Sequence, residues 1–381
     1  MDATPHELPD YPARARALAP LLAPLARDID EQRGLPRNVV DRLIGDGFFR
    51  LLQPKSLGGA ELHPVEFTKT TETLASMDAS VGWCVCQNNG CSMTTAYLSE
   101  DAAREIFGPE TGILAWGPPG GSSESVKVDG GYRVSGTWRF ASGSQNATWL
   151  GAHTRISGTN TVRTMIFPKS SVRMVDIWHT LGLRGTASNE YAAENLFVPD
   201  HHTCSRDNPK ERREQGLLYR FTSNQLYSVG FAGVGMGIAR GMIDAFLNLP
   251  AEKVSRGASK PMRENNVVQS QLAQSVARLR SARANLHNTW NEAWEHVVAT
   301  GEQTMEDRTM TRLASTWAIT QAREVVNTLY HAAGSIAIFE EQPFERRMRD
   351  IHTVAQQSQG RQLHFETVGQ ILLGVATENQ F

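Results

Sequence analysis

The N-terminal part of the chain carries apolar side chains at the spacing of amphipathic helices. From Leu18 to Ile29, apolar residues recur at intervals of three and four positions, which places them on one helical face. Pro36 and Pro64 interrupt this pattern, and proline is favoured in the first turn of a helix rather than in its interior. We therefore predict a helical first domain, residues 1–110, made of helices that are separated by short turns.

The pattern then changes to short segments in which apolar and polar residues alternate. Residues 132–135 form one such segment, and alternation with a period of two is typical of a strand. Gly130-Gly131 and residues 157–160 precede two of these segments and have the composition of hairpin turns. The pattern predicts a central antiparallel β domain, residues 111–205.

Long helical segments follow. Residues 264–300 contain neither proline nor glycine, and their apolar residues keep the spacing of one buried helical face: Val268, Leu272, Val276, Leu279, Leu286, Trp290, Ala293 and Val297. Segments 224–249, 307–333 and 350–373 share this pattern, so four helices can close around one core. We predict a C-terminal four-helix bundle, residues 206–381, and an α+β fold class for the chain.

Charge and apolar content argue against nucleic acids and membranes as partners. The 381 residues carry a formal net charge of -2, which leaves no basic surplus for binding the phosphates of a nucleic acid. The N-terminus lacks the basic and apolar regions of a secretory signal, and we expect no apolar run long enough to span a bilayer. We expect a cytoplasmic protein without nucleic-acid or membrane partners.

The cysteines do not have the spacing of a metal site. Cys84, Cys86, Cys91 and Cys204 lack the paired C-x2-C arrangement that zinc sites use. We expect reduced thiols in the core and no metal.

Several short motifs, taken in order, resemble one family. Trp138 to Gly143 is similar to a W-x-F-A-S-G segment, Gly182 to Thr186 to a G-x-R-G-T segment that Phe197-Val198-Pro199 follows, and Arg349-Asp350 to an R-D pair that opens the last helix. Helices, β domain and four-helix bundle also follow one another as in the acyl-CoA dehydrogenase fold. The chain therefore resembles the two-component (group D) flavin-dependent monooxygenase branch of the acyl-CoA dehydrogenase-like superfamily.

This resemblance implies a flavin site. A flavin needs backbone donors, an apolar wall for its ring, and cations or helix N-termini for its phosphate. By resemblance the cofactor-binding residues are Trp116, Gly117, Ala141, Ser142, Thr186, Arg256 and Gln356. For three of them a structural role remains open: a core aromatic for Trp116, a turn hydroxyl for Ser142, and a solvated surface arginine for Arg256.

The resemblance also shows where expected catalytic residues are missing. Acyl-CoA dehydrogenases remove an α-proton with a glutamate, and the two positions where the family places it fall at Tyr227 and Ser358. Neither residue is a carboxylate, which counts against dehydrogenation.

The hydroxylases of the family instead use two histidines near the flavin. Cys91 and Gln357 stand at those positions here. Gln356 and Gln357 can still donate hydrogen bonds, and His352 lies one helical turn before Gln356. Our catalytic candidates are therefore Ser142, Gln357, His352 and Cys91, with exposed helix positions as the structural alternative for His352 and the two glutamines.

The sequence leaves three functional hypotheses. The leading one is a monooxygenase that takes reduced FMN or FAD from a separate flavin reductase and uses O2 on a small aromatic or heterocyclic substrate; no nicotinamide-binding G-x-G-x-x-G motif is present in the chain. The second is a flavin-dependent dehydrogenase or oxidase of the acyl-CoA dehydrogenase type. The third is a flavin-free binding or scaffold protein, because fold does not determine function. We also expect a homo-oligomer, a tetramer, since the family closes its flavin site across subunits.

Overall fold

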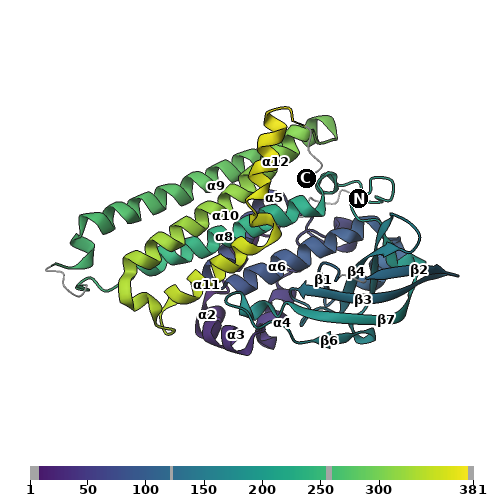
Figure 1. Ribbon diagram of the computed structural model, residues 1–381, viewed down its shortest axis with the longest axis horizontal. Coiled ribbons are helices and arrows are strands. Elements are labelled where there is room, and N and C mark those ends of the chain that lie inside the picture. The colour runs from purple at the N-terminus through teal and green to yellow at the C-terminus, as the bar shows by residue number, and fades with distance from the viewer. Residues whose placement is uncertain (1–7, 121–122, 255–259, 376–381) are drawn as a thin grey trace, which may run out of the picture. The chain divides into compact units, whose positions relative to one another are not determined.

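A computed structural model describes residues 8–120, 123–254 and 260–375. The described chain packs as two compact units. Among the described residues, unit 1 comprises those up to Phe67 and those within Cys84–His179 and Arg184–Ser223, and unit 2 comprises Thr68–Trp83, Thr180–Leu183 and those from Asn224 onward. The elements occur in the predicted order of helices, sheet and helices (Figure 1). The three domain boundaries predicted from the sequence stay a prediction.

Within the described residues, seven α-helices precede the sheet. Two of them have a side-chain cap at the N-terminus: Asp10 accepts a hydrogen bond from the backbone N–H of Ala13 at 2.8 Å, and Ser99 accepts one from Ala102. Prolines divide the first apolar stripe into short helices, because proline cannot continue a helix through its interior. The bounds are α1 Tyr11–Arg16, α2 Ala19–Leu22, α3 Ala26–Gln32, α4 Arg37–Gly45, α5 Pro64–Met77, α6 Ala79–Ser92 and α7 Glu100–Phe107.

The sheet of unit 1 has the strand order β6-β7-β3-β2-β4-β5-β8, with β1 paired to β4. The predicted turns join β2 to β3 and β4 to β5 as antiparallel hairpins. The bounds are β1 Leu114–Trp116, β2 Glu124–Val128, β3 Gly131–Ala141, β4 Trp149–Ile156, β5 Val162–Pro168, β6 Arg173–Val175, β7 Asn189–Pro199 and β8 Thr203–Cys204.

The sheet is mixed rather than purely antiparallel as predicted. β1 and β2 each pair with β4 in parallel. Parallel partners need a long connection between them, and here the β2–β3 hairpin lies in the chain between β1 and β4. The sequence pattern shows the hairpins, which are local, but not this pairing between distant strands.

Unit 2 contains the long helices, which run side by side in Figure 1. Leu279, Leu286, Trp290, Ala293 and Val297 of the predicted stripe are buried, whereas the stripe's first turns at Val268, Leu272 and Val276 are only half-buried. The bounds are α8 Ser223–Leu247, α9 Asn266–Thr300, α10 Met305–Ala333, α11 Pro343–Gln356 and α12 Leu363–Leu372.

Helix α8 corrects one sequence expectation. Its length and its hydropathy of 1.3 over an 18-residue window are sufficient for a membrane span, although we had found no such run in the sequence. However, 94% of that window is buried inside the protein. A helix that is apolar on all sides and buried is typical of a core helix.

The last predicted helix is in fact two helices. Arg349 and Asp350 do not open a helix, because α11 already begins at Pro343, a residue that favours the first turn. The chain leaves the helix at Gln357, whose extended backbone has ψ 157°. The Gln357 side chain then accepts a hydrogen bond from the backbone N–H of Gln359 at 2.7 Å, which stabilises the turn before α12.

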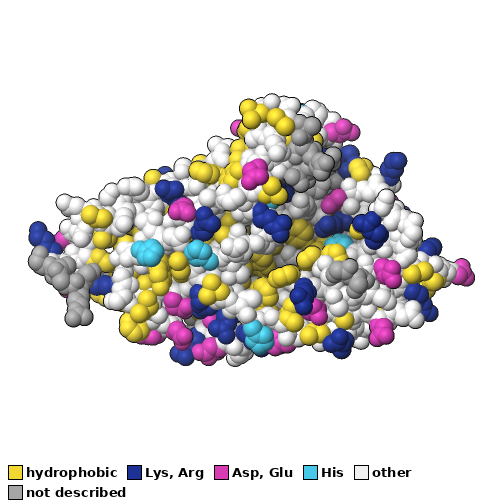
Figure 2. Space-filling view, viewed as in Figure 1, with side chains coloured by type: hydrophobic (Ala, Val, Ile, Leu, Met, Phe, Trp, Pro, Cys, Tyr) yellow, Lys and Arg dark blue, Asp and Glu magenta, His cyan; other side chains and the backbone are white. Residues whose placement is uncertain are grey.

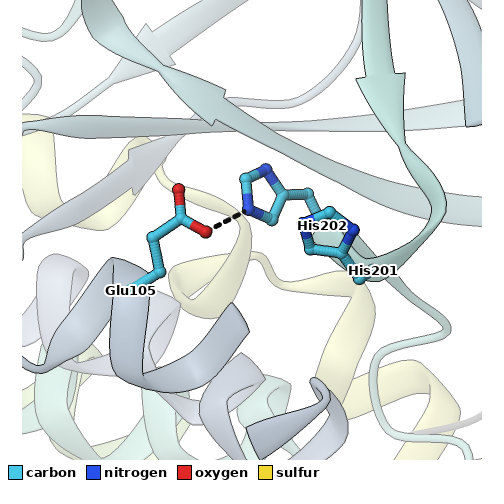
Figure 3. Close-up of side chains that lie close together, drawn as sticks. All are labelled: Glu105, His201 and His202. Carbon is cyan, nitrogen blue, oxygen red and sulfur yellow. Dashed lines mark hydrogen bonds and ion pairs between the residues drawn. The ribbon is translucent and has the colours of Figure 1, made fainter. Parts of the chain in front are cut away.

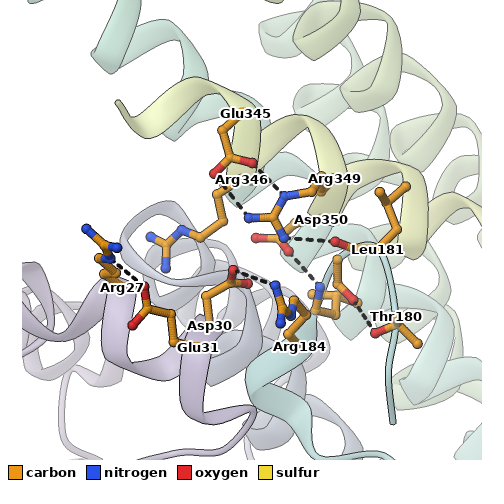
Figure 4. A network of polar contacts seen from close by, with 12 residues as sticks. Arg27, Asp30, Glu31, Thr180, Leu181, Arg184, Glu345, Arg346, Arg349 and Asp350 are labelled. Atoms are coloured by element: carbon orange, nitrogen blue, oxygen red, sulfur yellow. Dashed lines mark hydrogen bonds and ion pairs between the residues drawn. The ribbon is translucent and has the colours of Figure 1, made fainter. Parts of the chain in front are cut away.

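The Arg349-Asp350 pair holds a chain segment within unit 2. The Arg349 guanidinium donates to the carbonyl oxygen of Leu181 at 2.8 Å, and the Asp350 carboxylate accepts from the backbone N–H of Leu183 at 2.6 Å (Figure 4). A side chain at Gly182 would lie 2.3 Å from the carbonyl oxygen of Arg349. Glycine is therefore required there, and two motifs that are distant in sequence are in direct contact.

On the face drawn in Figure 2, basic and acidic side chains are interspersed with each other and with apolar ones, and neither forms a large patch of one charge. This agrees with the near-neutral charge of the chain and offers no basic track for a nucleic-acid backbone on that face.

We predict that Asp350→Ala destabilises unit 2. Asp350 is 5% exposed, so its loss removes a buried, charge-assisted acceptor from the Leu183 backbone. The free energy of unfolding in urea should fall by about 2 kcal/mol. Asp244→Ala is the control, because Asp244 is exposed and lies 3.9 Å from Arg240 in a surface ion pair, and it should change stability by less than about 0.5 kcal/mol. Equal effects of the two substitutions would contradict the prediction.

Candidate functional site

The ends of β1 and β3 lie against each other in unit 1. A side chain at Gly117 would lie 1.6 Å from the carbonyl oxygen of Arg139 and 3.2 Å from the backbone nitrogen of Ala141. Only glycine fits at this approach. It brings Trp116, at the end of β1, close to Ala141 and Ser142, at the end of β3, so four of the predicted cofactor residues come together.

A chain of hydroxyl groups extends from this point. The Ser142 and Ser188 hydroxyl oxygens lie 2.6 Å apart, and the Ser188 and Thr186 hydroxyl oxygens lie 2.7 Å apart. The backbone N–H of Gly143 also donates to the carbonyl oxygen of Thr186 at 2.9 Å. The predicted residues Ser142 and Thr186 are thus connected through Ser188, which the sequence reasoning did not single out.

Trp116 lies among polar groups rather than in a purely apolar core. The Arg206 guanidinium carbon lies 5.2 Å from the centre of the Trp116 ring, an arrangement suited to a cation–π interaction. The Gln87 amide nitrogen, on α6, lies 3.4 Å from the carbonyl oxygen of Trp116 and 3.7 Å from the Cys91 sulfur. Cys91 is therefore linked to Trp116 through Gln87. It is a fully buried thiol.

His153 packs edge-on against Trp116, with ring centres 4.8 Å apart. Its Nδ1 atom lies 2.9 Å from the Thr164 hydroxyl, and its buried Nε2 atom has no hydrogen-bond partner within the described residues. Burial lowers the pKa of His153 well below its ordinary value, and the nearby charge of Arg206 acts in the same direction. The ring is therefore neutral at pH 7. His153 belongs to no motif, and the sequence reasoning missed it.

Tyr191 is a second residue that the sequence reasoning missed. Its hydroxyl donates to the carbonyl oxygen of Gly151 on β4 and accepts from the backbone N–H of Gly117. Its ring stacks on Trp138 with centres 5.4 Å apart. Burial raises the pKa of Tyr191 well above its ordinary value, so the phenol stays protonated and keeps both hydrogen bonds. Tyr191 thereby supports the Trp116-Gly117 segment from within the sheet.

The predicted site residues of unit 2 have separate partners. His352 Nε2 lies 2.9 Å from the Asn327 side-chain oxygen on α10, and burial lowers the pKa of His352. The Gln357 amide bonds within its own turn, to Gln359 N–H and to the Ser358 hydroxyl. Gln356 is exposed at the end of α11. His352 and Gln357 thus each have a structural partner, and their catalytic roles stay predictions. Arg256 lies outside the described residues.

The two positions without a carboxylate have other roles. Tyr227 is 7% exposed and stacks on Phe231 with ring centres 5.8 Å apart, and Phe231 stacks on Trp83 at 4.0 Å. Ser358 is exposed in a short 3-10 helix and accepts a hydrogen bond from Gln357 at 3.0 Å. Neither residue is a carboxylate, so neither offers the glutamate base with which acyl-CoA dehydrogenases remove an α-proton.

The unit 1 residues suit the ring of a flavin. Trp116 offers an apolar wall, Ser142 a hydroxyl, and His153 Nε2 a buried polar atom beside that wall that has no partner among the described residues. Arg206 adds a positive charge next to the Trp116 ring. A polarised, partly apolar group bound here would satisfy this combination better than a hydrocarbon would, because buried polar atoms need partners.

Two family models match most of the helical parts of the chain. The acyl-CoA dehydrogenase N-terminal domain matches residues 13–111, and the acyl-CoA dehydrogenase C-terminal domain matches residues 229–361. Among curated relatives, an indole-3-acetate monooxygenase of Pseudomonas putida is 29% identical, and the alignment covers 91% of this chain and 89% of the relative. The oxygenase subunit HsaA of a flavin-dependent monooxygenase of Rhodococcus jostii is 27% identical, with 89% and 91% covered.

Solved structures of similar fold match almost the whole chain. The crystal structure of 3-HSA hydroxylase from Rhodococcus sp. RHA1 has a TM-score of 0.90 and 25% identity, with 98% of this chain and 99% of that chain covered. XiaF from Streptomyces sp., solved in complex with FADH2 and glycerol, has a TM-score of 0.89 at 20% identity, with 97% and 96% covered, and supports the fold. The resemblance seen in the motifs is therefore confirmed: the chain belongs to the acyl-CoA dehydrogenase-like superfamily, in its branch of two-component, flavin-dependent monooxygenases.

Proposed function

We propose that this protein is the oxygenase component of a two-component system. It takes reduced FMN or FAD from a separate flavin reductase and transfers one oxygen atom of O2 to a small aromatic or heterocyclic substrate. The observation that carries the proposal is the convergence of Trp116, Ser142 and Thr186 at the joined ends of β1 and β3. Bound reduced flavin supplies the electrons that activate O2.

The protein's own residues have distinct roles in this proposal. Trp116 packs against the flavin ring while Tyr191 and the Gly117 contact hold it in place. Ser142 donates a hydrogen bond to the ring, and its hydroxyl is oriented by Ser188 and Thr186. Gly117 allows the two strand ends to approach each other closely, and the backbone of Gly117 and Ala141 would line the flavin there.

The roles of the remaining predicted residues rest on the resemblance alone. By that resemblance Arg256 would bind the flavin phosphate, and Gln356 would add a polar contact to the cofactor. We keep Cys91, His352 and Gln357 as catalytic candidates, because relatives of this family carry two histidines at the positions of Cys91 and Gln357. Because a thiol and an amide replace those histidines, we expect a substrate that needs no deprotonation by an imidazole.

The named relatives bear on the substrate class. They include the indole-3-acetate monooxygenases and an FADH2-dependent resorcinol hydroxylase of Rhizobium sp., 24% identical with 97% of this chain covered. We therefore propose a planar ring compound as substrate. The alternative of a flavin-dependent dehydrogenase or oxidase is weakened by the aromatic stack at Tyr227 and the exposed turn at Ser358, since neither position supplies a carboxylate base.

We further propose a homotetramer in the cytoplasm. The α8 and α9 ends of unit 2 form an apolar groove lined by Phe246, Leu247, Leu249, Met262, Val268 and Leu272. Leu247 is 58% exposed, and exposed apolar patches of this kind are typical of protein interfaces. A second copy of the chain would cover the first turns of the α9 stripe, which unit 2 leaves half-buried.

We predict that the apoprotein binds reduced FMN or FAD in anaerobic titrations at concentrations on the order of tens of micromolar or below. Oxygen added to the complex should give a transient absorbance band distinct from that of oxidised flavin. A panel of acyl-CoA thioesters should not bleach the oxidised complex, because both base positions lack a carboxylate. No binding of either flavin would favour the flavin-free scaffold, and rapid bleaching without the transient band would favour the dehydrogenase.

We predict that Ser142→Ala accelerates the non-productive reoxidation of bound reduced flavin roughly fivefold, the effect of losing a hydrogen bond of about 1 kcal/mol. The measurement is a stopped-flow trace together with the yield of hydrogen peroxide. Ser144→Ala is the matched control, because Ser144 is a buried hydroxyl in the same turn that instead bonds to Ala187 at 3.4 Å. If the two variants reoxidise at the same rate, Ser142 is a structural turn residue.

We predict a tetramer by light scattering of the purified protein. Leu247→Glu places a charge in the apolar groove, which should shift the mass toward a smaller species with an unchanged circular dichroism spectrum, because charged side chains are depleted in interface cores. Val126→Glu, at an exposed apolar residue of β2, is the control and should keep the mass of the unmodified protein. A stable monomer that binds flavin fully would refute the assembly but not the enzyme.

A further inference from the structure

Three side chains with metal-binding atoms converge in unit 1, outside the candidate flavin residues. Glu105 lies on α7, and His201 and His202 lie in the turn between β7 and β8 (Figure 3). One ligand atom from each of the three residues lies within 4.8 Å of the others. His202 Nε2 and the Glu105 carboxylate are 3.0 Å apart.

The turn that carries the histidines is held on several sides. The backbone N–H of Asp200 donates to the carbonyl oxygen of Gly130 at 3.0 Å, and the Thr203 hydroxyl donates to the carbonyl oxygen of Asp200 at 2.9 Å. The Arg163 guanidinium donates to the Thr203 hydroxyl at 2.7 Å, and β8 pairs with β5. The backbone of the two histidines is therefore fixed before any ligand binds, which favours a preorganised site.

Packing also positions the side chains of the Glu105–His202 ion pair. The His202 ring, which is buried, packs edge-on against Trp149 with ring centres 5.3 Å apart. Glu105 precedes Ile106 and Phe107, whose burial anchors this side of α7, while its own carboxylate is about half exposed. His201 is exposed, and its ring centre lies 4.4 Å from that of His202. Two of the three groups, Glu105 and His201, are therefore open to solvent.

We propose that Glu105, His201 and His202 bind a divalent transition-metal ion, with Zn²⁺ as the best fit. Two imidazole nitrogens and one carboxylate oxygen are a known zinc ligand set, whereas Mg²⁺ and Ca²⁺ prefer ligand sets made only of oxygen. In a tetrahedral zinc site, ligand atoms about 2.1 Å from the metal lie roughly 3.4 Å from one another. The present arrangement needs only side-chain adjustments to reach that geometry, and it leaves the fourth position to water.

The bound ion would join helix α7 to the β7–β8 turn. It would replace the direct Glu105–His202 contact by two metal bonds and recruit His201, which has only a ring contact to His202 in the described structure. The cysteine spacing predicts no metal, and the sequence does not reveal this cluster, because Glu105 and His202 are 97 positions apart. The proposal does not depend on the flavin chemistry.

The test is a titration of the full-length, chelator-treated protein with Zn²⁺ by calorimetry, together with a thermal unfolding scan. We expect one equivalent to bind and to raise the unfolding temperature, since an ion that binds only the folded state stabilises it. Co²⁺ in place of Zn²⁺ should give the visible absorption of a four-coordinate site. His201→Ala and Glu105→Gln should each weaken Zn²⁺ binding roughly tenfold or more. Removing a group that only supports a metal ligand already lowers metal affinity by about this factor, and removing a ligand itself lowers it further.

Matched controls separate the site from general histidine affinity. His331→Ala removes an exposed histidine of α10 and should bind Zn²⁺ like the unmodified protein. His201 and Glu105 are exposed, so their variants should fold and should bind flavin with unchanged affinity. Zn²⁺ binding that is absent in the unmodified protein, or that is equal in all three variants, would overturn the proposal and leave Glu105 and His202 as an ion pair only.

Discussion

The carbonyl oxygen of Arg139 lies so close to Gly117 that no side chain is possible there, and the candidate site depends on this approach. Because β1 ends against β3 at this point, an aromatic ring from one strand and a hydroxyl from the other come together: Trp116 and Ser142. The Gly117 backbone N–H is satisfied by Tyr191, a residue of β7, so the contact is supported by a third strand. Packing of the sheet thus determines which side chains meet at the ends of these strands.

The sequence predicted those parts of the fold that depend on local patterns. The hairpins at Gly130 and at residues 157–160, and the buried face from Leu279 to Val297, follow from turn composition and periodicity. The parallel pairing of β1 with β4 depends on contacts between distant residues, which periodicity does not encode. The helix break at Gln357 has no proline or glycine at that position and results from a side chain that bonds its own turn.

The candidate site likewise contains residues that the sequence suggests and residues that only the structure reveals. Trp116, Ser142 and Thr186 could be proposed from the sequence because they match segments of the family, whose order along the chain is visible. Tyr191 and His153 could not, because each has its role through partners that are distant in sequence. An isolated histidine on a strand looks like any other, and only the structure shows that burial lowers the pKa of His153 and that its Nε2 atom lacks a partner within the described residues.

A motif shared with a family does not by itself mean a catalytic role. Arg349 and Asp350 match an R-D pair of the superfamily, yet here the guanidinium and the carboxylate are engaged by the backbone of Leu181 and Leu183. They hold the G-x-R-G-T segment at its first glycine, which a side chain would force away from α11. The same reasoning applies to Gln357, whose amide stabilises the turn before α12. Substitution of Gln357 would disturb that turn as well as any contact to substrate. Substitution of Ser142 separates a catalytic from a structural role more clearly, because Ser144 provides a matched control.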